Sequence, residues 1–483
     1  MQIRNICCIG AGYVGGPTMA VIADKCPNIQ VNVVDIDEKR IQKWNSKNFS
    51  ELPVYEPGLP DIISRCRGKN LNFSNLVEEK ISKADMIFIS VNTPTKKKGV
   101  GAGKALDLKW VEACARQVAI NAKNHTIVVE KSTLPVRTAE VLKSILNEAN
   151  FYHEPGDKEK SFDVLSNPEF LAEGTAVNDL LYPDRVLIGG EKIEAIESLI
   201  EIYKNWVPHE KIIKTNLWSS ELAKLTSNAF LAQRISSINS ITAICEETGA
   251  DIKEVSKAVG LDSRIGGGFL NSGPGFGGSC FKKDILNLVY LSSFFGLKEV
   301  ASYWESVLEI NDWQQSRISK LIVKKLFGNL TNKKIVILGF SFKANTNDTR
   351  ESPAINICKN LLEEGAFLHI IDPKVNENQI KADLNTDPLQ NINERNGSLP
   401  SREGRWCKTD YEKTSFKNAD AVVLLTEWED FKIIKWNEIS MIMRKPSWIF
   451  DTRAVINPKE VKDSGINLWR IGDGINNKSY EGW

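Results

Sequence analysis

Short runs of apolar residues alternate with helix-like patterns through the first part of the chain. Apolar runs occur at residues 6–9, 31–34, 86–89, 126–129 and 162–165. Runs of this length, separated by segments in which apolar residues recur at helical spacing, are typical of a parallel sheet covered by helices. The pattern therefore predicts a doubly wound α/β domain at the amino-terminal end.

A second alternation of the same kind fills the last third of the chain. Its expected strands are residues 334–339, 367–371, 421–425 and 448–450. This spacing predicts a second doubly wound parallel sheet. Residues 375–406 are rich in Asn, Asp, Glu and Pro. We expect them to form a partly disordered surface insertion.

One long helix is expected between the two sheets. Apolar and small residues recur at helical spacing from Leu222 to Thr242, Ser219 or Ser220 is suited to cap the helix, and Gly249 is suited to end it. A helix of about eight turns follows from this length. The chain therefore divides into three predicted domains, residues 1–215, 216–330 and 331–483.

Composition narrows the class of protein. The 483 residues include 62 Lys and Arg against 61 Asp and Glu, so the near-neutral chain is not expected to bind nucleic acid. Nine irregularly spaced cysteines without a C-x-x-C pair argue against disulfides and against a bound metal. No apolar run approaches the roughly 20 residues of a membrane helix, and the first strand begins too early for a signal peptide. We therefore expect a cytoplasmic protein without a membrane partner.

A glycine-rich turn follows the first expected strand. Residues 10–15, Gly-Ala-Gly-Tyr-Val-Gly, have the form G-x-G-x-x-G, which permits a tight turn and the close approach of a pyrophosphate. Asp35 ends the next strand, where a carboxylate binds the ribose hydroxyls of NAD and repels the 2′-phosphate of NADP. Lys39 and Arg40 lie close enough to leave NADP open. The pattern predicts dinucleotide binding, with NAD preferred.

Polar segments follow the next three expected strands. They are Asn92–Thr95, Glu130–Thr133 and Asn167–Gly174. Because ligands of open parallel sheets bind outside the carboxyl ends of the strands, we expect these segments to form the cofactor cleft together with the glycine turn.

The second sheet lacks the glycine fingerprint. Its first strand is followed by Gly339-Phe340-Ser341-Phe342-Lys343, so a second dinucleotide is not expected. Other strand ends carry residues 426–428 and 451–453. With Lys343, they suit a smaller anionic ligand that has an aromatic or polar head.

Cys280 is the strongest candidate for a nucleophile. It follows the glycine-rich residues 273–278 and precedes Lys282, Lys283 and Asp284. A helix N terminus and nearby ammonium groups favour the thiolate, which is the nucleophilic form. The alternative is a free cysteine buried as a small hydrophobe, the commoner fate of cysteines. The dinucleotide fingerprint elsewhere in the chain favours the nucleophile.

A thiolate beside a nicotinamide indicates oxidation as far as a carboxylate. A thiolate adds to an aldehyde to form a thiohemiacetal, which is again a hydride donor, and water cleaves the resulting thioester to an acid. Asp284 is expected on the same helix face as Cys280, where it could orient water, and Lys224 or Lys283 could stabilise the oxyanion. Taken alone, the spacing of Lys224 and Asn228 favours a solvated pair on a surface helix.

The chain resembles the UDP-glucose/GDP-mannose dehydrogenase family over nearly its whole length. The resemblance implies an NAD-dependent, four-electron oxidation of UDP-glucose to UDP-glucuronate without a metal, through a covalent intermediate on the cysteine. It further implies a homo-oligomer, either a dimer or a hexamer of dimers. The motifs that carry it are residues 10–17, Val91–Thr95, Glu130–Thr133, Asn167–Gly174, Phe276–Phe281 and Asn347–Ser352.

The resemblance also implies roles by motif position. The implied catalytic residues are Cys280, Lys224, Asn228, Asp284, Glu169 and Thr133. The residues implied to contact NAD are Gly10, Gly12, Tyr13, Val14, Gly15, Asp35, Arg40, Val91, Asn92, Thr93, Pro94, Thr95, Ser132, Glu173 and Arg350. The residues implied to hold UDP-glucose are Glu169, Phe170, Leu171, Ala172, Glu173, Lys224, Asn228, Arg264, Phe269, Leu270, Asn271, Gly275, Phe276, Gly277, Phe342, Lys343 and Arg453.

Two segments depart from the family pattern. Residues 271–275 are rich in glycine and proline where the family carries a lysine and a valine, and the insertion before Trp406 is longer. Two other functions stay open. The same thiolate chemistry would serve a dehydrogenase of GDP-mannose or of a UDP-N-acetylhexosamine, and a non-catalytic NAD-binding scaffold could keep the same fold.

Overall fold

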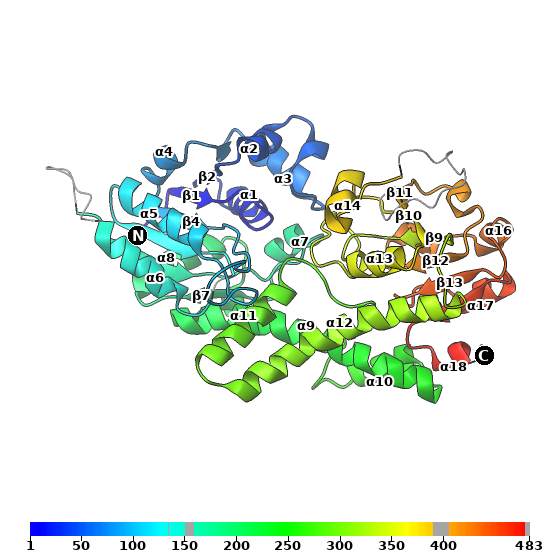
Figure 1. Cartoon of the computed structure of the whole chain (residues 1–483). Helices are drawn as coiled ribbons and strands as arrows, with labels where there is room; N and C mark the ends of the chain where they lie inside the picture. Colours follow the sequence, from blue (N-terminus) through cyan, green and yellow to red (C-terminus); the bar gives the residue numbers. More distant parts are fainter. Residues whose placement is uncertain (134, 150–158, 390–404, 479–483) are drawn as a thin grey trace. The chain divides into compact units, whose positions relative to one another are not determined.

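The computed structural model consists of two compact units, each built on one open sheet (Figure 1). The first unit comprises Met1–Ser227 and Leu286–Leu291, and the second comprises Asn228–Ile285 and Ser292–Trp483. The predicted division into three domains is finer than this and stays a prediction. The residues described are 1–133, 135–149, 159–389 and 405–478.

The first unit contains an eight-stranded sheet with the order β3-β2-β1-β4-β5-β6-β7-β8. Its neighbouring strands are parallel except β6 and β7. The order of the first six is that of a Rossmann fold, which confirms the predicted architecture. The strands are β1 (Asn5–Ile9), β2 (Gln30–Val34), β3 (Leu71–Ser74), β4 (Met86–Ile89), β5 (Thr126–Glu130), β6 (Phe162–Ser166), β7 (Val186–Gly189) and β8 (Ile212–Thr215).

Helices cover both faces of this sheet because successive residues of a strand point to opposite faces (Figure 1). In β1, Ile6 and Cys8 join one apolar core with α1, α2, α3, α7 and α8, while Cys7 and Ile9 join the other with α4, α5 and α6. The bounds are α1 (Gly15–Lys25), α2 (Glu38–Asn45), α3 (Leu59–Cys66), α4 (Val77–Ile81), α5 (Lys109–Asn121), α6 (Thr138–Asn147), α7 (Ala176–Leu181) and α8 (Ile193–Tyr203), with 3₁₀ turns at Phe49–Glu51 and His209–Lys211.

The long helix predicted between the sheets is α9 (Leu217–Thr248), whose 32 residues span about 48 Å at 1.5 Å per residue. Gly249 ends it in a left-handed conformation, with φ +87°. The predicted cap is wrong, because the helix begins earlier and the Ser219 amide donates to Asn216 Oδ1 at 2.8 Å. Leu222, expected on the apolar face, is 42% exposed.

The second unit contains a six-stranded sheet with the order β11-β10-β9-β12-β13-β14, in which all strands are parallel. Its strands are β9 (Lys334–Leu338), β10 (Phe367–Ile371), β11 (Trp406–Lys408), β12 (Ala421–Leu424), β13 (Trp448–Asp451) and β14 (Asn467–Arg470). Its helices are α10 (Ile252–Gly260), α11 (Phe281–Phe294, shared with the first unit), α12 (Lys298–Lys325), α13 (Pro353–Glu363), α14 (Glu377–Leu384), α15 (Glu429–Lys432), α16 (Trp436–Ser440), α17 (Pro458–Asp463) and α18 (Gly474–Lys478), with a 3₁₀ turn at Lys413–Phe416.

Five strands were not predicted; four of them lie at the edge of a sheet, and β7 lies next to the edge strand β8. These are β3, β7, β8, β11 and β14. An edge strand is covered on fewer sides, so it carries more polar residues and a weaker apolar signal. In β8, for example, two of four residues are exposed.

The predicted surface insertion at 375–406 is wrong in part. Helix α14 lies within it and buries Ile380 and Leu384, and Trp406 at its end is only 1% exposed in β11. Residues 390–404 lie outside the described residues, so the expectation of disorder there stays a prediction.

The two sheets share one hydrogen-bond pattern at the end of their first strands, β1 and β9. The Gly10 amide donates to Val34 O, and the Gly339 amide donates to Ile371 O, both at 2.8 Å. The residue after each of these acceptors is an aspartate, Asp35 in one sheet and Asp372 in the other. The two carboxylates differ in the donors that they meet.

Candidate active site

In the first unit, the segments predicted to form the cofactor cleft follow β1, β4, β5 and β6, which are consecutive in the sheet. Two hydrogen bonds join the segments after β4 and β5. Thr93 Oγ1 donates to Thr133 O at 2.9 Å, and Ser132 Oγ donates to Val91 O at 2.7 Å. The fold therefore brings these predicted residues together at one edge.

The glycine turn has the shape that a pyrophosphate requires. Gly10 has φ +111°, and a Cβ there would lie 2.2 Å from Ser90 O, while a Cβ at Gly15 would lie 2.0 Å from Gly10 O. Any larger residue at these two positions would clash with backbone. A Cβ at Gly12 would meet nothing within 4 Å, so its backbone faces open space. Gly12 therefore leaves room for a phosphate at the start of α1, and the turn fits NAD.

Asp35 keeps capacity for a ribose hydroxyl. It accepts from the amides of Ala11 at 2.9 Å and Asp37 at 3.0 Å, and from Arg40 Nη1 at 3.0 Å. A carboxylate has about four lone-pair positions, so one is left. Because the Arg40 guanidinium is paired with Asp35, it is not held out for a 2′-phosphate, which favours NAD.

Asp372, the equivalent carboxylate of the second sheet, is saturated. Its oxygens accept from Trp428 Nε1 at 3.4 Å and from five further donors, which exceeds the capacity of a carboxylate. No acceptor of Asp372 is left for a ribose; that this sheet does not bind a second dinucleotide stays a prediction. The five donors are the amides of Phe340, Ser341, Lys374 and Val375 and the hydroxyl of Ser341.

Glu169 is part of a buried polar cluster. Its Oε2 lies 2.8 Å from Nζ of Lys131, which is 3% exposed and also donates to Asn167 Oδ1 at 3.0 Å and to Tyr203 OH at 3.3 Å. Burial alone would raise the pKa of Glu169, but the Lys131 ammonium outweighs it and the pKa is lowered. Burial opposes the charge of Lys131 in the same way, but Glu169 and Tyr203 raise its pKa. Both groups therefore stay charged.

The sequence did not identify Lys131 and Tyr203 as candidate site residues. Lys131 stands inside the motif Glu130–Thr133, and a lysine directly after an apolar strand was a usable signal. Tyr203 ends helix α8, and nothing in its sequence neighbourhood pointed to the cleft.

Lys224 on α9 lies near the same cluster. Its Nζ is 5.3 Å from the ring centroid of Phe170, and its charge contributes to the lowered pKa of Glu169. Lys224 is 7% exposed and Asn228 is 5% exposed. The alternative of a solvated surface pair is therefore wrong.

In the second unit, Cys280 differs from every other cysteine of the chain. All nine cysteines lie in described residues, eight are buried, and Cys280 is partly exposed. Burial raises the pKa of Cys7 and of Cys114 to about 12, so these thiols stay protonated. Cys280 directly precedes α11, where its carbonyl accepts from the Asp284 amide at 2.9 Å. The predicted nucleophile is thus at a helix N terminus and accessible.

Asp284 lies one turn into α11 and is fully buried. Its Oδ2 accepts from Asn228 Nδ2 at 2.6 Å, and its Oδ1 lies 3.5 Å from Lys283 Nζ. The predicted catalytic residues Asn228 and Asp284 are therefore in direct contact, and Asn228 is one helical turn beyond Lys224 on the same face of α9.

The loop before Cys280 is held by amides of α9 and α12. Asn311 Oδ1 accepts from the Phe276 amide at 2.8 Å, Asn239 Oδ1 accepts from the Gly273 amide at 2.9 Å, and Gln314 Nε2 donates to Gly273 O at 3.0 Å. A Cβ at Gly275 would lie 2.7 Å from Asn311 Oδ1. The absence of a side chain at Gly275 therefore allows the loop to pack closely against α12.

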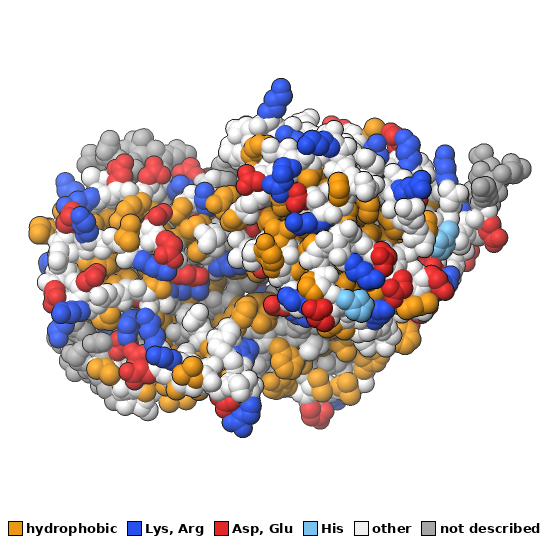
Figure 2. All heavy atoms as spheres, turned by 180° about the vertical axis from the view of Figure 1, so that it is seen from behind, with side chains coloured by type: hydrophobic (Ala, Val, Ile, Leu, Met, Phe, Trp, Pro, Cys, Tyr) orange, Lys and Arg blue, Asp and Glu red, His pale blue; other side chains and the backbone are white. Residues whose placement is uncertain are grey.

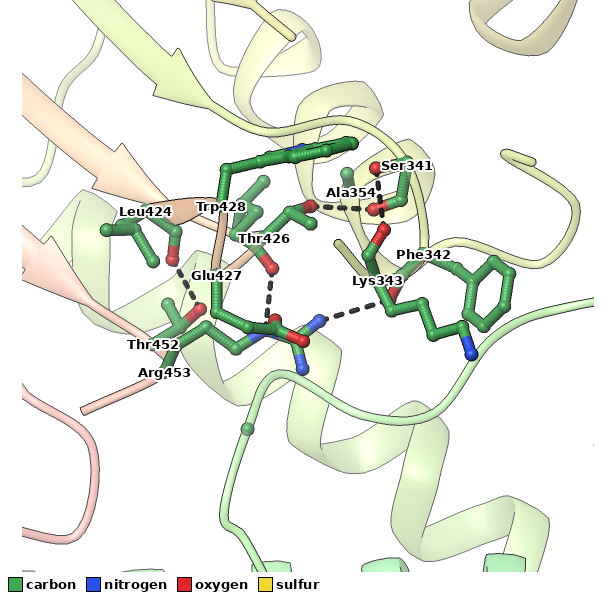
Figure 3. Close-up of polar contacts among 12 residues, drawn as sticks. Ser341, Phe342, Lys343, Ala354, Leu424, Thr426, Glu427, Trp428, Thr452 and Arg453 are labelled. Atoms are coloured by element: carbon green, nitrogen blue, oxygen red, sulfur yellow. Dashed lines mark hydrogen bonds and ion pairs between the residues drawn. The ribbon is translucent and has the colours of Figure 1, made fainter. Parts of the chain in front are cut away.

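The predicted sugar-nucleotide residues of the second sheet converge at the ends of β9, β12 and β13 (Figure 3). Arg453 Nη2 donates to Phe342 O at 3.2 Å, and Arg453 Nε lies 3.0 Å from Glu427 Oε2. The Phe342 ring would lie 3.1 Å from a Cβ at Gly278. The fold therefore places Phe342 and Arg453 directly beside the loop that carries Cys280.

Other predicted residues have different surroundings. The Leu270 side chain packs in an apolar cluster with Ile238 and Ile252, so it is not available to a ligand. The Arg264 side chain is 87% exposed and paired with Asp262 at 2.6 Å. Arg350 Nε donates to Asp348 Oδ1 at 2.9 Å. The roles of Arg264 and Arg350 stay predictions.

The remaining predicted residues fall into two groups. Gly277 packs too closely for a side chain, since a Cβ there would lie 2.5 Å from Glu351 O. The others are partly or fully exposed: Tyr13, Val14, Asn92, Pro94, Thr95, Leu171, Ala172, Glu173, Phe269 and Asn271.

Within the described ranges, no group of three or more His, Cys, Asp or Glu side chains could hold a metal ion. No helix of that part of the chain is long and apolar enough to cross a membrane. On the face shown in Figure 2, Lys and Arg side chains are interspersed with Asp and Glu.

Three sequence models of one family match the chain in succession. They describe the NAD binding domain (residues 4–207), the central domain (218–313) and the UDP binding domain (336–458) of the UDP-glucose/GDP-mannose dehydrogenase family. UDP-glucose 6-dehydrogenase 4 of Arabidopsis thaliana is 53% identical over 478 residues, which are 97% of each chain. UDP-glucose 6-dehydrogenase of Bos taurus is 52% identical over 99% of this chain and 94% of its own length. A UDP-glucose dehydrogenase structure from Pyrobaculum islandicum matches with a TM-score of 0.81, at 27% identity over 98% of each chain.

Proposed function

The chain belongs to the UDP-glucose/GDP-mannose dehydrogenase family, and we propose that it oxidises UDP-glucose to UDP-glucuronate, reducing two NAD for each sugar nucleotide. It is an NAD-dependent oxidoreductase. The proposal is supported by the identity to UDP-glucose 6-dehydrogenases over 97% of the chain. The observation that carries the chemistry is Cys280, the accessible thiol at the end of a glycine-rich loop.

Four electrons leave the C6 carbon in two steps. NAD, when bound, accepts the hydride of each oxidation. In the first step the C6 alcohol loses a hydride and its hydroxyl proton and becomes an aldehyde. The Cys280 thiolate then adds to the aldehyde carbon, and the resulting thiohemiacetal loses the second hydride to give a thioester. Water cleaves the thioester, which releases the carboxylate and restores the thiol.

Charged side chains assist these steps. Lys224 provides an ammonium that stabilises the oxyanion formed when sulfur adds. Asp284, fixed by Asn228, orients the water and accepts its proton. Glu169, kept ionised by Lys131, and Thr133 help to place water and to move protons. Phe342, Lys343 and Arg453 are proposed to bind the uridine diphosphate, and Gly12 with Asp35 to bind NAD.

Counting NADH against UDP-glucose consumed to completion tests the four-electron reaction. The expected ratio is two. A ratio of one, with aldehyde accumulating, would contradict covalent oxidation to the acid. A panel of sugar nucleotides tests the substrate, and a preference for GDP-mannose or for a UDP-N-acetylhexosamine would replace UDP-glucose. Binding of NAD without any turnover would indicate a non-catalytic scaffold.

Cys280→Ser is the matched chemical test. A serine hydroxyl adds less readily, and its ester is hydrolysed more slowly, so the steady-state rate of NADH formation should fall by about 10³-fold or more. Ser279→Ala, which alters the neighbouring hydroxyl 3.4 Å from the sulfur, is the control and should keep most activity. A Cys280→Ser variant with a normal rate would exclude the nucleophile.

We also propose a cytoplasmic homo-oligomer, either a dimer or a hexamer of dimers. Exposed aromatic side chains on α9 and α12, including Phe230 (55%), Tyr303 (52%) and Trp313 (42%), suit a subunit interface. The free cysteines suit a reducing compartment. Light scattering of the purified protein measures the assembly, and a monomer at micromolar concentration would contradict it.

A further inference from the structure

Two glutamates of the first unit meet in the interior with no assigned role. Glu130 ends β5 and is 1% exposed, and Glu221 lies near the start of α9, just after its first turn, and is 3% exposed. The two side chains are close enough to share a hydrogen bond. Within the described part of the chain, neither Glu130 oxygen meets any other hydrogen-bond donor. Two ionised carboxylates in contact and out of water are strongly unfavourable, so the pair must hold a proton.

The surroundings decide which glutamate holds that proton. Glu221 accepts from the backbone amides of Arg137 at 2.7 Å and of Ala139 at 2.9 Å. These amides lie at the N terminus of α6, where the helix dipole also favours a negative charge. Among the residues that the structure describes, no backbone amide donates to Glu130. Glu221 is therefore the carboxylate, and Glu130 is the acid that donates to it.

The other charged groups near the pair do not change this assignment. Burial and then Glu221 raise the pKa of Glu130, and Lys143 on α6 opposes this only weakly. Burial also raises the pKa of Glu221, against the two amides, and Glu140 on α6 adds to the rise. The strands beside β5 contribute Ile89 and Ser166 at this register, which do not titrate.

We propose that Glu130 is a positioning residue, held as a neutral acid, whose proton joins β5 to Glu221 and so fixes α9 and α6 to the loop after β5. This part rests on the proposed function. Lys131, Ser132 and Thr133 directly follow Glu130, and Lys224 is three residues after Glu221 on α9. The loop after β5 carries Thr133 and also Lys131, which pairs with Glu169. The shared proton therefore sets the distance between this loop and the Lys224 ammonium on α9. A displacement of about 1 Å in such groups can lower a rate by about 10²-fold.

The protonation state is tested by stability, without any assay of activity. Glu130→Gln keeps a donor toward Glu221 but cannot ionise. In the native protein the pKa of Glu130 lies above its unfolded value, so the stabilising contribution is complete below about pH 4 and is lost as the pH rises toward the folded pKa. The thermal midpoint of Glu130→Gln should therefore match that of the native protein near pH 4 and exceed it by a few degrees at pH 8. If the thermal midpoints of the two proteins differed by the same amount at every pH in this range, the assignment of the proton to Glu130 would be overturned.

The positioning role is tested by kinetics with UDP-glucose and NAD. Glu130→Met has a similar length and no donor, so kcat should fall by about tenfold while KM for UDP-glucose changes little. Glu130→Gln should restore kcat to within about twofold. Glu140→Gln removes an exposed carboxylate from α6, the helix whose amides bind Glu221, and is the control. Equal loss in the Met and Gln variants, or in neither, would overturn the positioning role. A native enzyme inactive on UDP-glucose would instead contradict the proposed function, and the stability test would still decide the proton.

Discussion

At the scale of single residues, the charge of Glu169 depends on Lys131. The two side chains are 15% and 3% exposed, and their oxygen and nitrogen lie 2.8 Å apart. In this environment the ammonium lowers the pKa of a carboxyl group that burial alone would raise. A carboxyl group of low pKa is a weak base at neutral pH, so the proposed role of Glu169 is that of a permanent negative charge that places water.

Lys131→Met tests this dependence. Without the ammonium, burial prevails and the pKa of Glu169 rises above its usual value, so the acid limb of the pH–rate profile should move to higher pH by at least about one unit. Tyr203→Phe removes one partner of Lys131, whose contact is 3.3 Å, but keeps the charge, and should leave the limb in place. An unshifted limb in Lys131→Met would mean that Glu169 does not titrate in the rate-limiting step.

At the scale of elements, the loop before Cys280 depends on its glycines for contact with α12. Gly275→Ala would place a Cβ 2.7 Å from Asn311 Oδ1 at a φ of +129°, which L side chains rarely adopt. Distortion of this kind costs about 1–3 kcal/mol, so KM for UDP-glucose should rise about tenfold or more. Gly268→Ala is the matched control, since a Cβ there meets nothing within 4 Å. Equal KM values in both variants would show that the loop tolerates the change.

A second element-scale prediction concerns the end of β14. Arg470, whose side chain is 10% exposed, pairs with Asp251 at 2.7 Å and with Asp473 at 2.8 Å. Arg470→Met leaves the buried carboxylate of Asp473 and the partly buried one of Asp251 without their cation and should lower the free energy of unfolding by about 3–5 kcal/mol. Lys432→Met breaks an exposed pair with Glu429 and should change it by less than about 1 kcal/mol. Denaturant titration measures both, and similar losses would contradict the prediction.

At the scale of the whole molecule, the two sheets have one architecture but are predicted to bind different ligands, NAD in the first sheet and the uridine diphosphate in the second. The first keeps an open glycine and a carboxylate with spare acceptor capacity, whereas Asp372 of the second is saturated. The second sheet has instead Lys343 and Arg453 at its strand ends, which suit a diphosphate.

Reciprocal variants test this division. Asp35→Ala removes a ribose acceptor and should weaken NAD binding about tenfold without changing the affinity for UDP. Lys343→Met removes a cation and should weaken UDP binding about tenfold without changing the affinity for NAD. Isothermal titration of NAD and of UDP against each variant gives four dissociation constants. Weakening of both ligands by either single variant would contradict the division.

Much of this arrangement could be predicted because the signals are local. The central strands of both sheets are continuous apolar runs, the predicted β4 and β10 match the observed bounds, and β9 ends one residue earlier than expected. The glycine turn, Cys280 and Asp284 are separated by short, readable spacings. The edge strands, the Asn216 cap and helix α14 were missed because their apolar signal is weak or their partners are distant in sequence.

Alternating apolar runs, the dinucleotide fingerprint and the thiol motif determined the fold class, the cofactor and the type of reaction, because each depends on residues that are neighbours along the chain. Tertiary structure alone decided which of nine thiols is accessible, that Lys224 is buried beside Phe170, and that Lys131 keeps Glu169 charged. It also decided that Glu130 meets Glu221, 91 positions away. Burial and charge pairing depend on distances in space, which the order of residues does not record.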